Sequence, residues 1–203
     1  MRCAGSRRRS RSRYAVATLA SGHVLLSDHP GRDAIRFATR KSGVLVVRRA
    51  GEGYALDLPA LPAALRPLPE LVGLIGGAPI ATLWRDGGYA VLVYPDEQAV
   101  RALRPDFATL AQGENLLIVA TARGSDHDIV SRAFAPAAGI DEDPVTGTAH
   151  ALVAPYWAAP LGRRRLTACQ ASSRGGRLVC ELAGDRVLLE GSCVTVIEGR
   201  FRR

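Results

Sequence analysis

Residues 141–150 read Asp-Glu-Asp-Pro-Val-Thr-Gly-Thr-Ala-His, and they lead directly into an apolar run that ends at Trp157. Pro144 cannot continue a helix towards its N-terminus, and Gly147 lets the backbone approach a ligand closely. The first amides of a helix lack internal acceptors and carry the positive end of the helix dipole. The pattern therefore predicts a helix start that faces an anion. An ordinary capped helix fits the spacing equally well.

Further blocks on both sides of this motif extend the pattern. They are Ser131–Pro136 upstream, and Leu161-Gly162, Leu166–Leu178, Asp185–Val187 and Gly191 downstream. In order and spacing they resemble the C-terminal half of the phenazine-biosynthesis-like (PhzF) isomerase family, whose relatives share the diaminopimelate-epimerase-like fold. The resemblance extends from about Ala17 to the C-terminus.

The resemblance implies an α+β fold with two lobes of mixed strands, each wrapped around a central helix, and with the first lobe incomplete here. We expect residues 1–16 to be a disordered basic segment outside the family. Residues 17–60 would be the remnant of the first lobe. Residues 61–203 would hold the connection and the second lobe, with some strands shared between lobes. A faint internal repeat agrees, because residues 17–26 and 149–157 both predict small-residue helices that precede strands. Taken alone, the repeat supports only a mixed α+β protein.

Alternating apolar residues and turn residues predict the remaining elements. Strands are expected at 35–39, 43–48, 54–58, 81–85, 89–94 and 115–120, and helical segments around 97–103 and 107–112. Residues 50–53 predict a hairpin turn. Four prolines mark a connection between the lobes, namely Pro59, Pro62, Pro67 and Pro69.

The resemblance also implies roles for the residues of the motif. Asp143 is the candidate catalytic residue and would orient the polar group of the substrate. Gly147 and Thr148 are the candidate substrate-binding residues, which would offer N–H donors to a carboxylate. The cysteine-dependent racemases of this fold carry a thiol where this chain has Thr146. A hydroxyl cannot shuttle a proton as a thiolate does, so racemase chemistry of that kind is disfavoured.

Other polar residues near the motif have two readings. His150 is either a packed or solvent-facing histidine or a catalytic one, and the first is favoured. His23 and His29 are interpreted as structural or surface residues. The segment with Gln170, Ser172 and Arg174 is either a strand with a tight turn or a wall of the cleft. The Arg163–Arg165 run is interpreted as a solvated loop.

The net charge of +8 belongs mostly to the first sixteen residues, which contain six arginines and no acidic residue. The rest has 21 basic and 19 acidic side chains, a net charge of +2. A basic arm can bind nucleic acid, but Tyr14 is its only aromatic residue and no recognition module follows. Since the arginine run replaces the expected start of the first central helix, we interpret residues 1–16 as an out-of-frame translation.

The four cysteines show no paired spacing and no nearby histidine cluster, so no metal is expected. No Gly-rich phosphate loop follows a predicted strand, so no organic cofactor is expected either. No apolar run reaches the ~20 residues that span a bilayer, and no secretory signal is visible. These features favour a cytoplasmic protein with no membrane partner and no nucleic-acid partner.

The leading hypothesis is an isomerase-family protein that moves a proton on a small carboxylate-bearing substrate by cofactor-free general acid/base chemistry. We expect this chain to be impaired, because the resemblance places the proton-shuttling glutamate of the family upstream of anything present here. The alternative is a non-catalytic small-anion-binding fragment. An arginine-armed nucleic-acid binder ranks third. A homodimer is left open.

Overall fold

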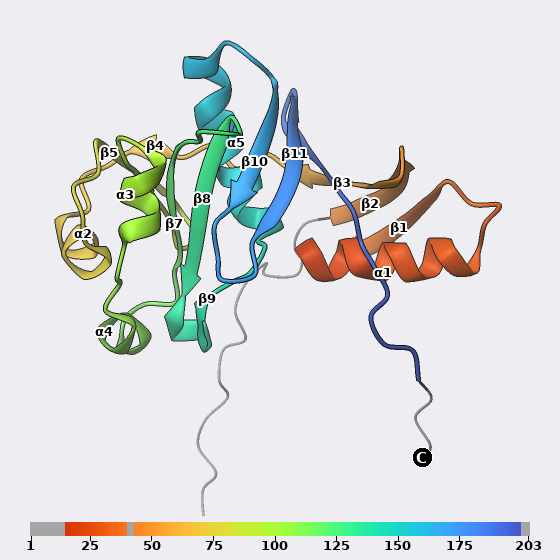
Figure 1. Ribbon diagram of the computed structural model, residues 1–203, viewed down its shortest axis with the longest axis horizontal. Helices are drawn as coiled ribbons and strands as arrows, with labels where there is room; N and C mark the ends of the chain where they lie inside the picture. Colours follow the sequence, from red (N-terminus) through yellow and green to blue (C-terminus); the bar gives the residue numbers. More distant parts are fainter. Residues whose placement is uncertain (1–14, 40–42, 200–203) are drawn as a thin grey trace, which may run out of the picture.

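The computed structural model describes residues 15–39 and 43–199. Within these ranges a single mixed sheet of twelve strands runs in the order β1-β2-β3-β12-β11-β10-β8-β7-β6-β5-β4, with β9 paired to β8 (Figure 1). The strands are β1 (Ala34–Thr39), β2 (Gly43–Ala50), β3 (Gly53–Pro59), β4 (Ala64–Leu65), β5 (Ala81–Arg85), β6 (Tyr89–Val93), β7 (Leu117–Arg123), β8 (Ile129–Ala135), β9 (Ile140–Glu142), β10 (Arg165–Gln170), β11 (Gly176–Ala183) and β12 (Arg186–Gly191). The helices are α1 (Ala15–Asp28), α2 (Pro69–Ile75), α3 (Glu97–Ala102), α4 (Phe107–Gln112) and α5 (Gly147–Leu161), with a 3-10 turn at Pro136–Ala138.

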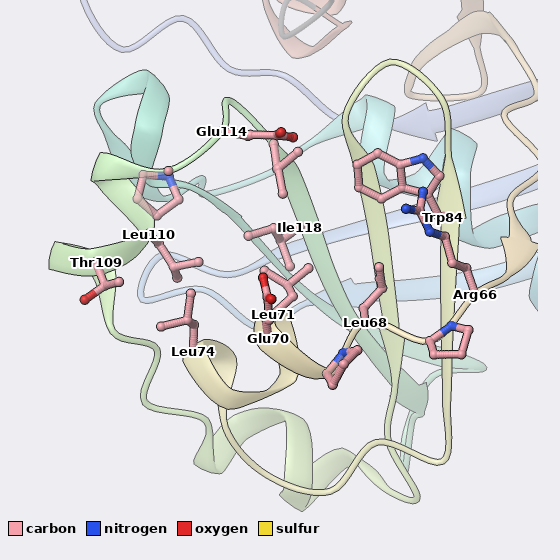
Figure 2. A pocket seen from close by; sticks show the side chains of 15 residues that line it. Arg66, Leu68, Glu70, Leu71, Leu74, Trp84, Thr109, Leu110, Glu114 and Ile118 are labelled. Carbon is pink, nitrogen blue, oxygen red and sulfur yellow. The ribbon is translucent and has the colours of Figure 1, made fainter.

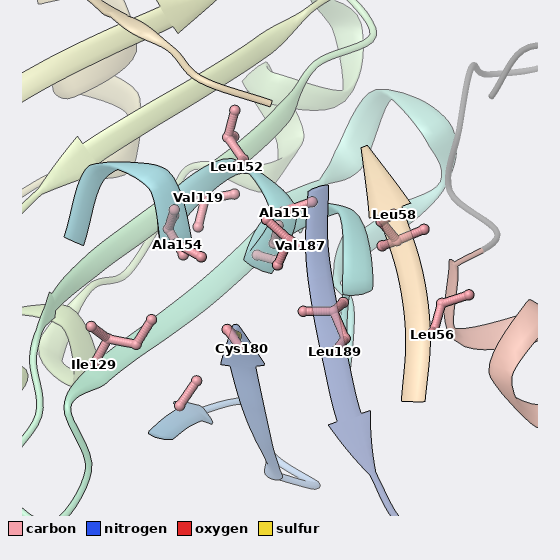
Figure 3. Packing of buried hydrophobic residues seen from close by; sticks show 14 of the residues in the cluster. Leu56, Leu58, Val119, Ile129, Ala151, Leu152, Ala154, Cys180, Val187 and Leu189 are labelled. Carbon is pink, nitrogen blue, oxygen red and sulfur yellow. The ribbon is translucent and has the colours of Figure 1, made fainter. Parts of the chain in front are cut away.

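The two faces of the sheet pack against different helices. One face packs around α5 and contributes alternate residues such as Val91, Val119 and Leu189 to the larger core (Figure 3). The opposite face of β6, β7 and β8 presents residues such as Leu92 and Ile118 to α2, α3 and α4, which form a second core. Because successive side chains of a strand point to opposite faces, one apolar strand supplies both cores.

Helix α5 is apolar on every side and is buried along most of its length. It continues through Pro155, which has no amide to offer the carbonyl of Ala151 four residues earlier. The Leu61 amide donates to that carbonyl instead, at 2.9 Å. The helix ends at Gly162, whose left-handed conformation (φ 62°) suits a glycine C-cap. The proline thus ties the connection before β4 to the central helix.

Helix α1 lies over β1, β2 and β3 at the other end of the sheet (Figure 1). A Cβ at Gly22 would lie 2.4 Å from a methyl carbon of Val47, so glycine permits this close approach. Val24 and Leu25 remain exposed. Strand β3 contacts both α1 and α5, so one continuous sheet connects the two helices.

The expected α+β class is confirmed, and most predicted elements are present with bounds within three residues. Helix α1 begins at Ala15, inside the segment 1–16 that was expected to be disordered, and the bounds of that segment stay a prediction. The remainder of that segment lies outside the described residues. The lobe boundaries at 17–60 and 61–203 stay a prediction. Strand β4 and helix α2 lie in the proline-rich connection and were not predicted from the sequence. Helix α2 carries Pro69 in its first turn, where proline is tolerated. No described helix has the length and apolar character needed to cross a bilayer.

Candidate functional site

The turn before α5 is held by its own side chains. Thr146 is the N-cap residue and has an extended backbone, but its hydroxyl does not cap the helix. The hydroxyl Oγ1 donates instead to Oδ2 of Asp143 at 2.5 Å. The half-buried carboxylate of Asp143 is therefore held beside the helix N-terminus, and the candidate catalytic group has a defined orientation.

Gln170, the last residue of β10, clamps this turn from the neighbouring strand. Its Oε1 accepts from the Thr146 amide at 2.7 Å. Its Nε2 donates to the carbonyl of Asp143 at 2.6 Å and to Oγ1 of Thr146 at 3.1 Å. Gln170 is fully buried, so these bonds are shielded from water. Gln170 thus acts on the turn as a positioning residue, which the sequence pattern did not reveal.

His150 lies one turn inside α5 and is fully buried. Its Nδ1 is 2.8 Å from the carbonyl oxygen of Thr146, which can only accept, so Nδ1 carries the proton. Its Nε2 lies 3.5 Å from the Ser131 hydroxyl. Burial lowers the pKa of His150 to about 4, more than offsetting the opposing effect of the Thr146 hydrogen bond. The ring is neutral at physiological pH and supports the turn from within, in agreement with the favoured reading of a packed histidine.

The turn between β10 and β11 packs directly against the motif. A Cβ at Gly176 would lie 2.2 Å from a methyl carbon of Val145, so only glycine fits there without movement. The Ser172 hydroxyl donates to the carbonyl of Pro144 at 2.8 Å and accepts from the Gly175 amide at 3.1 Å. The segment is therefore a strand followed by a tight turn, as one of the two readings predicted, and the turn packs against the motif. Arg174 is exposed in the turn.

A cavity of about 370 Å³ opens at this turn, next to the N-terminus of α5. Its lining residues come from α1, β3, the motif, the β10–β11 turn, β11 and the end of β12, namely Leu19, Leu56, Val145, Gly147, Gly175, Gly176, Arg177, Leu178, Leu189, Glu190, Gly191, Ser192 and Cys193. No hydrogen bond joins the Gly147 amide to another described residue. The cavity therefore combines apolar side chains with glycine backbone and a helix N-terminus, which suits a small ligand with an anionic group.

The three predicted site residues lie together but face this cavity unequally. Gly147 lines it, whereas Asp143 and Thr148 are not among its lining residues. Thr148 is buried in the first turn of α5. Cys193, which follows β12, also lines the cavity. Burial raises the pKa of its thiol, so Cys193 is protonated at neutral pH and is a poor base.

The remaining candidates have structural roles. His23 is hydrogen-bonded to Tyr54 and Thr195, each at 3.1 Å, and His29 is exposed. The loop interpretation of the arginine run holds for its exposed first two residues, but Arg165 opens β10 and pairs with two glutamates. In the described part of the chain, no three His, Cys, Asp or Glu side chains gather as a metal site.

The mixed sheet around a central helix defines a diaminopimelate-epimerase-like protein, and the candidate site lies at the N-terminus of that helix. Residues 75–199 match the family model described as "Phenazine biosynthesis-like protein". An "uncharacterized isomerase" of Pseudomonas aeruginosa is 47% identical over 92% of this chain and 71% of its own length. The chain belongs to the phenazine biosynthesis-like family, as the sequence resemblance predicted.

Solved structures agree with this assignment. A putative phenazine biosynthesis protein of Clostridium difficile has a TM-score of 0.81 at 33% identity, with 92% of this chain and 72% of that chain covered. A predicted epimerase of Pseudomonas aeruginosa has a TM-score of 0.57 at 18% identity, covering 86% of this chain and 69% of that chain, and shares the fold alone. The chain is thus an isomerase-like member of this family.

Proposed function

We propose that the cavity before α5 holds a small carboxylate-bearing substrate, and that the site serves cofactor-free proton transfer on it. The observation that carries the proposal is the Gly147 amide, which lies at a helix N-terminus, lines the cavity and has no acceptor among the described residues. A substrate carboxylate would supply that acceptor and would lie at the positive end of the helix dipole.

Asp143 and the apolar side chains of the cavity would contact the rest of the substrate. The Thr146 hydroxyl and the Gln170 clamp hold Asp143 beside the helix start, where its carboxylate would accept a hydrogen bond from a polar group of the substrate. Leu19, Leu56 and Leu189 would cover an apolar part of the ligand. Proton transfer needs a group of suitable pKa within about 3 Å of the moving proton, or one water away. Glu190 also lines the cavity, but Arg165 holds both oxygens of its carboxylate. Asp143 would therefore have to orient the ligand and also move the proton, so we propose that turnover by this chain is weak.

The anion site can be tested by titrating the ¹⁵N-labelled chain with sulfate and with benzoate. The amide resonances of Gly147 and Thr148 should shift saturably, while the amide of Gly162 at the other end of α5 should not. Equal shifts at both ends, or none at Gly147, would contradict the proposed site.

Chemistry can be tested by following solvent deuterium exchange at carbon in a panel of small 2-amino, 2-hydroxy and unsaturated carboxylates. The expected result is slow exchange that Asp143→Asn reduces further, by about 10²-fold or more if the carboxylate takes part in proton transfer. Asp141→Asn is the matched control, because Asp141 is exposed two residues away. Rapid exchange by the 203-residue chain would refute the proposed impairment. Saturable anion binding with no exchange on any substrate would favour the alternative, a non-catalytic anion-binding fragment.

A further inference from the structure

A second and larger cavity lies on the face of the sheet opposite to α5 and the motif. It measures about 490 Å³ and is enclosed by α2, α4, β5 and β7 (Figure 2). Its lining comprises Arg66, Pro67, Leu68, Pro69, Glu70, Leu71, Leu74, Trp84, Thr109, Leu110, Gly113, Glu114, Leu116, Ile118 and Pro136. Its volume falls within the ~300–1,000 Å³ typical of small-molecule sites.

The floor of this cavity is built from the second core. Leu71, Leu110 and Ile118 are buried there, whereas Leu68 and Leu74 are only half-buried. In Figure 2 the labelled leucines and Ile118 project between α2, α4 and β7. Partly exposed apolar side chains around a hollow lose contact with water when a ligand covers them. The cavity therefore favours a ligand with an apolar body.

Trp84 forms one wall and is held in place. Its Nε1 donates to Oδ1 of Asp86 at 3.1 Å, and the Arg66 guanidinium lies 5.1 Å from the ring centroid. A ring fixed in this way can stack against an aromatic or alicyclic group at little entropic cost. Arg66 places a positive charge at the Trp84 end of the cavity.

Two exposed carboxylates also line the cavity and outweigh the positive charge of Arg66. Glu70 stands in the first turn of α2 and Glu114 follows α4. Neither has an ion-pair partner among the described residues. The charged side chains of the lining thus sum to one net negative charge, and the Arg66 cation is already placed over an aromatic face. A ligand cation is better matched to this site than an anion.

We infer that this cavity binds a small hydrophobic amine, with its apolar ring against Trp84 and the leucines and its ammonium group towards Glu70 and Glu114. The site is separate from the proposed carboxylate site in its elements, its apolar core and the sign of the ligand charge that it selects. The amine site can therefore be tested independently of the proposed isomerase chemistry.

The test uses the full chain labelled with 5-fluorotryptophan and titrated with phenethylamine. The chain has two tryptophans, so Trp84 reports on this cavity while the buried Trp157 is an internal control. Phenylacetate and ethylbenzene share the ring and differ in charge. The Trp84 ¹⁹F resonance should shift saturably with phenethylamine, and Trp157 should not respond. An ion pair with an exposed carboxylate contributes up to about 1 kcal/mol, which predicts binding up to about fivefold tighter than that of phenylacetate.

Variants identify the charged groups. Replacing both acids, by Glu70→Gln and Glu114→Gln, should remove the preference for phenethylamine over phenylacetate without abolishing binding of the ring. Glu52→Gln, in the exposed turn between β2 and β3, is the matched control and should change nothing. Equal affinity for phenethylamine and phenylacetate in the unaltered chain overturns the inference, as does tighter binding of phenylacetate. A Trp84 resonance that phenethylamine does not shift also overturns it.

Discussion

The amide of Thr146 donates to Oε1 of Gln170 at 2.7 Å, although the two residues are 24 positions apart in the chain. Gln170 returns two hydrogen bonds to the same turn through Nε2. The start of α5 therefore depends on the last residue of β10 for its position. This dependence makes the geometry of the proposed site sensitive to a residue outside the motif.

Replacing Gln170 by Leu should destabilise the protein and disorder the motif. The change leaves the Thr146 amide without its acceptor in a buried position, which costs about 1–3 kcal/mol. Chemical denaturation measures the loss, and the Gly147 amide resonance reports on the turn. Gln98→Leu, at an exposed position of α3, should be nearly neutral. A Gln170 variant of unchanged stability would show that the clamp is dispensable.

Replacing Gly176 by Ala should force Val145 away from the β10–β11 turn. The added carbon would lie 2.2 Å from a Val145 methyl group, and overpacking of this kind costs about 1–3 kcal/mol. Adding Val145→Ala should recover part of the loss, because it removes both methyl groups that clash. The coupling energy of this double-mutant cycle is the measurement. Gly73→Ala is the control, since no atom lies within 4 Å of its Cβ. Additive effects of the two changes would contradict the predicted clash.

His150 should make stability depend on pH below neutrality. Its folded pKa of about 4 is below the ordinary value of 6.5, so the unfolded state binds the proton more readily. The stabilisation is present above pH 6.5 and is lost as the pH falls towards 4, by up to about 3 kcal/mol for a shift of this size. Free energies of unfolding measured across this range should fall less steeply for His150→Gln than for the unaltered chain. Parallel profiles would mean that His150 titrates normally.

The ion pair between Arg132 and Glu142 should stabilise the folded protein more than the ion pairs on the surface do. Two hydrogen bonds of 2.8 and 2.9 Å join these largely buried side chains, and Arg132 also donates to the Leu103 carbonyl after α3. Arg132→Met leaves Glu142 unpaired within the motif and should cost about 2–4 kcal/mol in unfolding free energy. The exposed pair of Arg101 and Glu97 offers the comparison, because Arg101→Met should cost about 0.5 kcal/mol or less. Similar losses of unfolding free energy in the two variants would contradict this prediction.

Local patterns in the chain predicted much of the fold. The strand at Ala81–Arg85 and the helix at Phe107–Gln112 were predicted with the bounds that the structure has. Both are short and have clear signals: an apolar strand before a Gly-Gly turn, and a helix after Asp106, whose carboxylate caps it. The helix after the motif was predicted at 149–157, whereas α5 runs from Gly147 to Leu161. Its presence could be predicted because Pro144 and Gly147 restrict the backbone locally.

The packing around the start of α5 depends on the tertiary structure and could not be predicted from the sequence. The sequence alone suggested Gly147 and the carboxylate of Asp143 as candidate site residues, since a helix start and an acidic residue beside it are local features. It could not pair Gln170 with Thr146, or require Gly176 opposite Val145, because those contacts depend on how β10 and β11 align beside α5. The same holds for the cavity between α2 and α4, whose walls are distant in the chain. Backbone restrictions act between neighbours, whereas burial and charge balance arise when the sheet closes around its helices.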